Sequence, residues 1–199
     1  MKKVTIVGLG ALGSHLVLLA RNWDVSIRII DFDRVESKNV QSQLHTSMGI
    51  GKNKAVALQS TMRGLYRRDL ESKPVKLTEN NQDELLGGSD LVIDCTDNIA
   101  ARLLIQNYCS KNKEAADKDW IDCLHGCLSA DGTFARIIWT EHFIPDAEGE
   151  EGAATCEDGR NLPFHVQAAA MIAQIVQKYL ETGMRQSWQI TAFSAMRLM

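Results

Sequence analysis

Three glycines at the spacing GxGxxG, Gly8, Gly10 and Gly13, are typical of a turn that binds phosphate. They follow a short apolar run and open a helix-like segment. Glycines let the backbone approach a phosphate closely, and the first turn of a helix offers unpaired N–H groups to an anion. Asp31 ends the next apolar run about 20 residues on, where a carboxylate can accept ribose hydroxyls. A turn that only packs a helix on a strand is the alternative, but the acid favours nucleotide binding.

The stretch after Asp31 reads DFDRVESKNVQSQ and is almost entirely polar. Asn39 and Gln43 follow within it, and Asp33 is grouped with these nucleotide-binding residues. Lys54, in GKNK at the start of a predicted helix, could reach a triphosphate as a point charge, although alone it would be an ordinary helix-start lysine. A dinucleotide-dependent dehydrogenase needs nothing particular after its ribose acid. The stretch therefore favours ATP over NAD.

A third polar group, Asp94-Cys-Thr-Asp97-Asn98, follows a buried apolar run. Open α/β sheets bind ligands at the carboxyl ends of their strands. We therefore predict that Asp97 holds Mg²⁺ beside the phosphates, with Asp94 as a weaker candidate. Alternatively, Asp97 or Asn98 caps the following helix, and both roles are compatible.

Apolar runs alternate with segments of helical spacing, which predicts a Rossmann-like, mostly parallel α/β sheet with helices on both faces. The expected strands are 4–7, 26–30, 74–77, 91–94 and 120–123, and the expected helices are 14–21, 52–68 and 100–110. Residues 133–140 predict an antiparallel extension of the sheet toward the C-terminus. A helix is expected over 161–180 with its stop at Gly183, followed by a last strand at 189–193.

The chain has 199 residues, of which 45% are hydrophobic, so we expect one domain over residues 1–199 with a long acidic loop at 141–160. A net charge of -3 makes nucleic acid an unlikely principal partner. The glycines interrupt the first apolar run, which argues against a secretory signal, and no other run is long enough to cross a membrane. Five cysteines without a CxxC pair indicate a reduced, cytoplasmic protein.

The motifs GLGALG, DFDRVESKNVQSQ, GKNK and LVIDCTDN, in this order, resemble the ThiF/MoeB family, whose adenylating fold is shared with ubiquitin-activating enzymes. The resemblance extends from residue 4 to about 180. It implies a homodimer that uses ATP and Mg²⁺ to adenylate the C-terminal carboxylate of a small ubiquitin-like or sulfur-carrier protein. The roles it implies are the nucleotide turn for Gly8, Gly10 and Gly13, ribose for Asp31, phosphates for Asn39, Gln43 and Lys54, and Mg²⁺ for Asp97.

One departure from the family concerns catalysis. The family places an arginine where this chain has Ser42, so one neutral hydroxyl replaces a fork of charged donors that would stabilise the leaving pyrophosphate. Lys38, Arg34 or a guanidinium from a neighbouring subunit are candidate substitutes. The alternative is a nucleotide-binding scaffold of the same fold with weak or lost catalysis, and an NAD-dependent oxidoreductase is a more distant one.

A second departure concerns zinc, because many relatives carry two CxxC pairs. Here the nearest approach is CLHGC, with Cys123, His125 and Cys127 at a spacing that fits no standard structural zinc site. We expect buried or pocket-lining cysteines. Relatives also have N-terminal helices that complete a partner's active site, and since this sequence starts at its first strand, we expect a minimal version of the fold.

Cys156 lies in the acidic loop, in a TC sequence before the last long helix. In the family, a cysteine placed there forms a thioester or persulfide-type link with the activated carrier, so the resemblance makes Cys156 catalytic together with Lys54 and Asp97. Attack on an acyl-adenylate needs a thiolate, which Arg160 and His165 would favour and the neighbouring carboxylates oppose. The alternative is a loop cysteine without a role in the chemistry.

Overall fold

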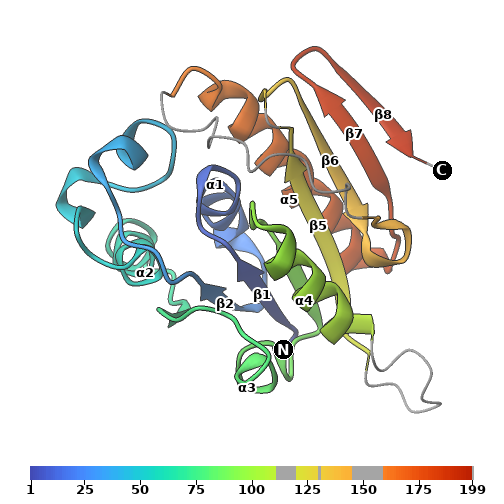
Figure 1. Cartoon of the computed structure of the whole chain (residues 1–199), viewed down its shortest axis with the longest axis horizontal. Helices are drawn as coiled ribbons and strands as arrows, with labels where there is room; N and C mark the ends of the chain where they lie inside the picture. The colour runs from blue at the N-terminus through green and yellow to red at the C-terminus, as the bar shows by residue number, and fades with distance from the viewer. Residues whose placement is uncertain (111–119, 130, 145–158, 199) are drawn as a thin grey trace.

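Buried apolar runs form the centre of one eight-stranded sheet. The computed structural model describes residues 1–110, 120–129, 131–144 and 159–198. The strand order is β3-β2-β1-β4-β5-β6-β7-β8 (Figure 1). All residues of the apolar runs 4–7 and 91–94 are buried, as expected for strands covered on both faces. This arrangement confirms the predicted α/β class.

The first five strands of the sheet pair in parallel, in the order typical of nucleotide-binding doubly wound sheets. They are β3 (Glu71–Lys73), β2 (Ser26–Ile30), β1 (Lys3–Val7), β4 (Leu91–Asp94) and β5 (Asp122–Leu128). Their carboxyl ends meet at one edge of the sheet, where the sequence places its polar motifs.

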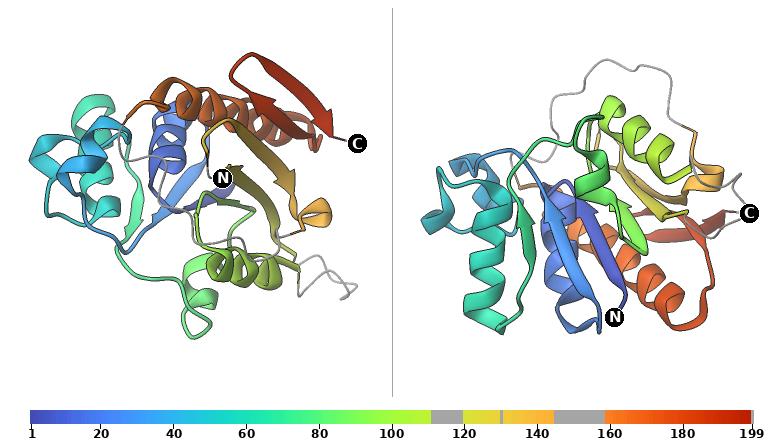
Figure 2. Two further views of the ribbon diagram at one scale, coloured as in Figure 1. Left: turned by 45° about the horizontal axis from the view of Figure 1, so that its top comes forward. Right: turned by 90° about the horizontal axis from the view of Figure 1, so that it is seen from below.

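Helices cover both faces of the parallel half. Apolar residues of α1, α2 and α5 share one core cluster, while those of α3 and α4 belong to a second cluster on the other face (Figure 2). The helices are α1 (Ala11–Leu19), α2 (Lys54–Tyr66), α3 (Gln82–Leu86), α4 (Ile99–Ser110) and α5 (Leu162–Thr182). Short 3₁₀ turns are η1 (Ala20–Asn22), η2 (Ser37–Gln41), η3 (Ser47–Gly49) and η4 (Thr140–His142).

Three antiparallel strands extend the sheet, and the sequence predicts strands for the first two of them, at 133–140 and 189–193. They are β6 (Phe134–Trp139), β7 (Ser187–Thr191) and β8 (Ser194–Leu198). The predicted end of α5 is also confirmed, because Gly183 follows the helix with φ 70°, in the left-handed region that glycine adopts readily. The strand β8 was not predicted, since four of its five residues are exposed and show no alternation between polar and apolar types.

The strand predicted at 74–77 is wrong. The observed strand β3 ends just before Pro74, which has no N–H to donate to a ladder of hydrogen bonds. Its first residue, Glu71, instead forms ion pairs with Arg28 (3.1 Å) on the adjacent strand β2 and with Lys3 (3.2 Å) on β1, the strand beyond it. Similarly, β5 begins two residues later than predicted and runs on to Leu128.

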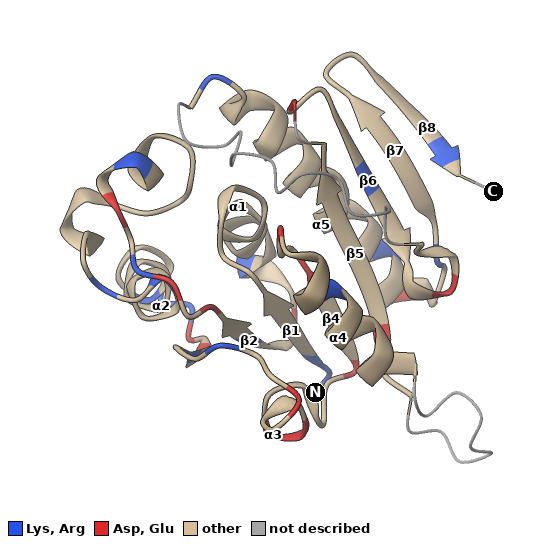
Figure 3. Cartoon of the chain, viewed as in Figure 1, with Lys and Arg blue, Asp and Glu red and all other residues tan. Residues whose placement is uncertain are grey.

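The charges of the described chain are mixed in sign. Figure 3 shows basic and acidic residues interspersed over the helices and strands, with no stripe of one sign in this view. No helix among the described residues is long and apolar enough to cross a membrane.

Candidate nucleotide-binding site

Two glycines of the GxGxxG motif are required by close packing. Gly8 has φ 87°, and a Cβ there would lie 2.8 Å from the carbonyl oxygen of Cys95. A Cβ on Gly13 would lie 1.9 Å from the carbonyl oxygen of Gly8. Gly13 belongs to the first turns of α1, so the prediction that it lies in the preceding turn is wrong. Because these two residues have no side chain, α1 and the residue after β4 can pack directly against the turn.

Gly10 has a different environment, because among the described residues no atom outside its chain neighbours and its own helix lies within 4 Å of the position of its absent Cβ. It is the N-cap of α1, which has neither a side-chain cap nor an acidic residue in its first turn. Within the described part of the chain, no residue therefore covers the positive end of the helix beside Gly10. This opening fits a phosphate group, which would accept the N–H groups of the first turn.

Asp31 ties the glycine turn to the end of β2. Its carboxylate accepts the backbone N–H of Leu9 (2.7 Å) and that of Asp33 (2.8 Å). Burial raises the pKa of Asp31, although Lys54 and the two amide hydrogen bonds act in the opposite direction. Each carboxylate oxygen keeps a lone pair beyond these bonds, so the group can still accept a ribose hydroxyl.

Lys54 lies beside this carboxylate because the start of α2 is fixed to the same loop. The side chain of Asn53 caps α2 and donates to the carbonyl oxygens of Asp31 (2.9 Å) and Asp33 (3.1 Å). The Lys54 ammonium is then 3.0 Å from the Asp33 carboxylate. Asn53 was not predicted from the sequence, although an asparagine before a helical run is a common N-cap. Hydrogen bonds and one ion pair thus connect Lys54, Asp31 and Asp33 through Asn53 and the backbone; we call this group the bonded unit.

The loop with Asn39 and Gln43 packs against the start of α1. Asn39 is buried, and its side-chain oxygen accepts the backbone N–H of Glu36 (2.8 Å). The backbone N–H of Leu44 donates to the hydroxyl of Ser14 on α1 (2.9 Å). The side-chain oxygen of Gln43 is buried and has no hydrogen-bond partner in the described part of the chain. This loop therefore lies beside the glycine turn, as a phosphate-binding role requires.

Ser42 has neutral neighbours. Its side chain is 0% exposed, and its hydroxyl has no partner among the described residues. Nε2 of His15 lies 3.2 Å from the carbonyl oxygen of Ser42, and Nε2 of His45 lies 3.0 Å from that of Leu9. Burial lowers the pKa of His15, and it lowers that of His45 to about 4. Both imidazoles are therefore uncharged near neutral pH, and neither histidine was predicted at this site from the sequence.

The two candidate substitutes for the missing arginine have partners of their own. The Arg34 guanidinium donates to the carbonyl oxygen of Gly51 (2.6 Å). The Lys38 ammonium is 3.4 Å from the Glu36 carboxylate. Each contact uses only part of the donors of its side chain, since a guanidinium has five N–H groups and an ammonium three.

Asp97 is exposed and makes no hydrogen bond or ion pair with the residues that the structure describes. Asn98 caps α4, since its side-chain oxygen accepts the N–H of Ala101 (3.0 Å). An exposed carboxylate at this edge of the sheet fits Mg²⁺, which prefers oxygen ligands and keeps several waters. Asp94 is fully buried, and both of its oxygens have partners, which makes it unsuitable as a metal ligand.

The CLHGC segment lies in β5 and places its histidine in the core. Nδ1 of His125 contacts Asp94 (2.8 Å), Nε2 contacts the hydroxyl of Thr140 (2.9 Å), and the sulfur of Cys123 is 3.5 Å from Nε2. Both ring nitrogens are therefore engaged. No group of three or more His, Cys, Asp or Glu side chains that could hold a metal occurs within the described ranges.

Cys156 lies outside the described residues. Gly159, the first described residue after it, lies against Gln41 in η2, since a Cβ on Gly159 would be 3.1 Å from the Gln41 carbonyl oxygen. The chain thus returns from the acidic segment to the loop that carries Asn39 and Gln43.

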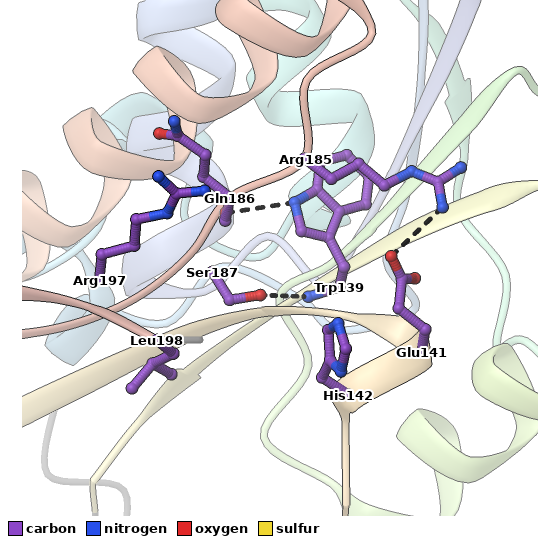
Figure 4. Close-up of a pocket in the computed structure, with 8 residues that line it drawn as sticks. All are labelled: Trp139, Glu141, His142, Arg185, Gln186, Ser187, Arg197 and Leu198. Atoms are coloured by element: carbon purple, nitrogen blue, oxygen red, sulfur yellow. Dashed lines mark hydrogen bonds and ion pairs between the residues drawn. The ribbon is translucent and has the colours of Figure 1, made fainter.

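A separate pocket of about 310 Å³ lies at the other end of the sheet (Figure 4). Its lining includes Trp139 at the end of β6 and Arg197 on β8. Arg185, which also lines it, pairs with Asp122 at the first residue of β5. This pocket is therefore at the amino ends of the parallel strands, away from the predicted nucleotide-binding residues.

The model of the ThiF family matches residues 1–182. The chain belongs to the ThiF family. Its fold is also that of two solved structures. The ATP complex of MccB from E. coli is 15% identical with a TM-score of 0.75, and the match covers 99% of this chain and 63% of MccB. PaaA is 19% identical with a TM-score of 0.73, and the match covers 100% of this chain and 64% of PaaA.

Curated relatives of this ThiF-family chain are similar over about half of its length. The adenylyltransferase and sulfurtransferase MOCS3 of Anopheles gambiae is 35% identical over 109 residues, which cover 53% of this chain and 25% of MOCS3. The SAMP-activating enzyme E1 of Haloferax volcanii is 33% identical, over 54% of this chain and 41% of the enzyme. The sulfur carrier protein adenylyltransferase of Thermus thermophilus is 34% identical, and the match covers 52% of this chain and 40% of that enzyme. The aligned part is thus well under half of each relative.

Proposed function

We propose that this protein is an ATP-dependent adenylyltransferase that activates the C-terminal carboxylate of a small ubiquitin-like or sulfur-carrier protein. The bonded unit of Leu9, Asp31, Asn53 and Lys54 is the observation that carries the proposal, because it puts a ribose acceptor and a phosphate cation beside the open start of α1. The relatives named as adenylyltransferases and as a SAMP-activating enzyme support it.

The predicted residues have distinct roles in this proposal. The turn at Gly8, Gly10 and Gly13 and the start of α1 bind phosphate, and Asp31 accepts the ribose hydroxyls. Asn39 and Gln43 orient the phosphates, and Lys54, with Asp33 as its partner, steadies the charge that develops on the pyrophosphate. Asp97 would hold Mg²⁺, which neutralises phosphate charge when it is bound.

The reaction has two stages. The carrier carboxylate attacks the α-phosphorus of ATP, which forms an acyl-phosphate bond and breaks the bond to pyrophosphate. The thiolate of Cys156 then attacks the acyl carbon, a thioester forms and AMP leaves. The role of Cys156 rests on its place in the sequence and on its family resemblance.

A homodimer and a cytoplasmic location complete the proposal. Dimerisation would let a second subunit supply the cation that Ser42 lacks. The free thiols of Cys95, Cys109, Cys123 and Cys127 are compatible with a reducing compartment.

Carrier-dependent exchange of pyrophosphate into ATP is the test. We expect exchange with a carrier whose C-terminal carboxylate is free, and none when that carboxylate is amidated. Cys156→Ala should leave exchange intact and abolish the thioester, which mass spectrometry detects. Tight ATP binding without exchange with any carrier would contradict the proposal.

The second candidate function is a nucleotide-binding scaffold with weak or lost catalysis. The buried hydroxyl of Ser42 favours it, because this hydroxyl has no hydrogen-bond partner among the described residues, and the imidazole that contacts the Ser42 carbonyl is neutral. ATP binding by calorimetry, together with an absence of exchange, would favour this candidate.

A further inference from the structure

A buried chain of polar contacts connects η4 to the turn that carries Asp97. One oxygen of Asp94 accepts the backbone N–H (2.9 Å) and the hydroxyl (2.7 Å) of Thr96. The other oxygen lies 2.8 Å from Nδ1 of His125, whose Nε2 lies 2.9 Å from the hydroxyl of Thr140. Asp94 and His125 are both 0% exposed. Four side chains therefore link η4 to the residue directly before Asp97.

Arg102 holds the same turn from α4, the helix that lies over β4 and β5 in Figure 1. Its guanidinium donates to the carbonyl oxygen of Thr96 and also contacts the sulfur of Cys127 on β5. The glycine turn closes the remaining side, since a Cβ on Gly8 would lie 3.0 Å from the Thr96 nitrogen. The N–H, hydroxyl and carbonyl of Thr96 are thus all engaged, so the turn cannot shift without breaking one of these bonds.

The chain of contacts contains a buried ion pair. Burial disfavours the charged form of His125, but Cys123 and the Asp94 carboxylate outweigh it and raise the pKa of His125 to about 9. Burial alone would raise the pKa of Asp94, but the hydrogen bond from His125 and the charge of Arg102 lower it. The ring of Phe143 stacks on His125 at 4.0 Å, which fixes the imidazole plane.

We propose that Asp94, His125 and Arg102 are positioning residues that hold the turn of Thr96 and Asp97 in the geometry needed for a metal–nucleotide complex. Partners behind a metal ligand commonly change metal affinity or activity by about 10- to 100-fold. This inference rests on the proposed function at one point, namely that Asp97 faces the metal of bound ATP.

The test compares His125→Phe with the wild-type full chain. The phenyl ring keeps the stack on Phe143 but loses both hydrogen bonds of the imidazole. We expect about tenfold faster deuterium exchange of the amides of residues 95–98 in the ligand-free protein. We also expect about tenfold weaker binding of ATP with Mg²⁺ in titration calorimetry, and little change in the binding of AMP without metal.

Two further variants keep the inference falsifiable. Thr140→Val removes only the hydroxyl that contacts Nε2 of His125, and residue 140 contacts neither Thr96 nor Asp97. This variant replaces His125→Phe in the test if His125→Phe does not fold. We expect about threefold changes in amide exchange and in the affinity for ATP with Mg²⁺. Ile105→Val disturbs the core cluster that includes Cys123 but removes none of these hydrogen bonds, and it should behave as wild type. The inference is overturned if the folded His125 and Thr140 variants match wild type in both exchange and magnesium-dependent binding. If wild type itself does not bind ATP with Mg²⁺, the proposed function fails, while the exchange comparison still decides whether the network holds the turn.

Discussion

Strands β2 and β4 flank β1, and each leads into a buried aspartate at the same edge of the sheet. The Asp31 carboxylate, after β2, accepts hydrogen bonds from two backbone amides and lies near Lys54, but burial outweighs these groups and its pKa is raised. Asp94, at the end of β4, faces His125 and lies near Arg102, so its pKa is lowered despite complete burial. One carboxylate keeps capacity for a ligand, and the other is committed to an internal ion pair.

The difference continues in the next acidic residue of each loop. Asp33 pairs with Lys54 inside the nucleotide site, whereas Asp97 is exposed and has no partner among the described residues. The loop after β2 thus carries its own cation, and the loop after β4 is held rigid from behind. We infer that the first loop binds the nucleotide and the second presents a single free carboxylate to the metal.

The largest effect is expected at that free carboxylate. Asp97→Ala should lower carrier-dependent pyrophosphate exchange by at least about 1,000-fold, because a metal at this position supplies several kcal/mol of charge stabilisation. Binding of AMP without metal should change little, as measured by calorimetry. Asp24→Ala, on an exposed loop, is the matched control. Retention of more than a tenth of the exchange in Asp97→Ala would assign the metal to another residue.

The ion pair behind the β4 loop should make stability depend on alkaline pH. The pKa of His125 is raised from 6.5 to about 9 in the folded state, so its contribution is fully present below pH 6.5 and is lost as the pH rises through 9. The free energy of unfolding should fall by up to about 3 kcal/mol over this interval. Urea denaturation at several pH values measures the slope, which His125→Phe should lack. An equal slope in both proteins would locate the titration elsewhere.

A smaller effect is expected where the β2 loop lacks its arginine. Ser42→Arg alone should lower the free energy of unfolding by about 2 kcal/mol, because the serine is fully buried and the imidazole of His15 contacts its backbone carbonyl oxygen. The double variant Ser42→Arg with His15→Ala removes that imidazole. It should regain stability and exchange pyrophosphate faster than wild type, as thermal unfolding and the exchange assay report. No gain in exchange by the stable double variant would favour the scaffold function.

The sequence was sufficient to predict the elements that local pattern determines. Continuous apolar runs predicted β1 and β4, and the helical spacing before Gly183 predicted α5. The edge strands were harder to predict from the sequence. Strand β3 is short and its Glu71 forms an ion pair with Lys3, and β8 is largely exposed. Such strands form through pairing with a neighbour, which a local pattern does not encode.

The proximity of several predicted site residues was predictable to the same degree. Gly8, Asp31 and Lys54 carry a motif that specifies their chemistry, and the structure brings them together. The positions of His45 and His125 depend on contacts between distant segments, such as the 31-residue separation of His125 and Asp94. A lone histidine in a sequence has no signal that distinguishes such a role from ordinary core packing.

The smallest predicted effect separates the two aspartates directly. Asp31→Asn replaces one accepting oxygen with an NH₂ group, which leaves the N–H of Leu9 or Asp33 without its acceptor and weakens the contact to ribose. ATP affinity should fall about tenfold in calorimetry, with a loss of about 1 kcal/mol in stability. Asp94→Asn can keep its oxygen toward Thr96 while its NH₂ group donates to neutral His125, so ATP affinity should stay within about threefold of wild type and the pKa of His125, followed by NMR, should fall. Equal losses of ATP affinity in the two variants would show that the aspartates do not differ in role, because Asp94→Asn can keep its contacts to Thr96 and His125 whereas Asp31→Asn must lose one of its own.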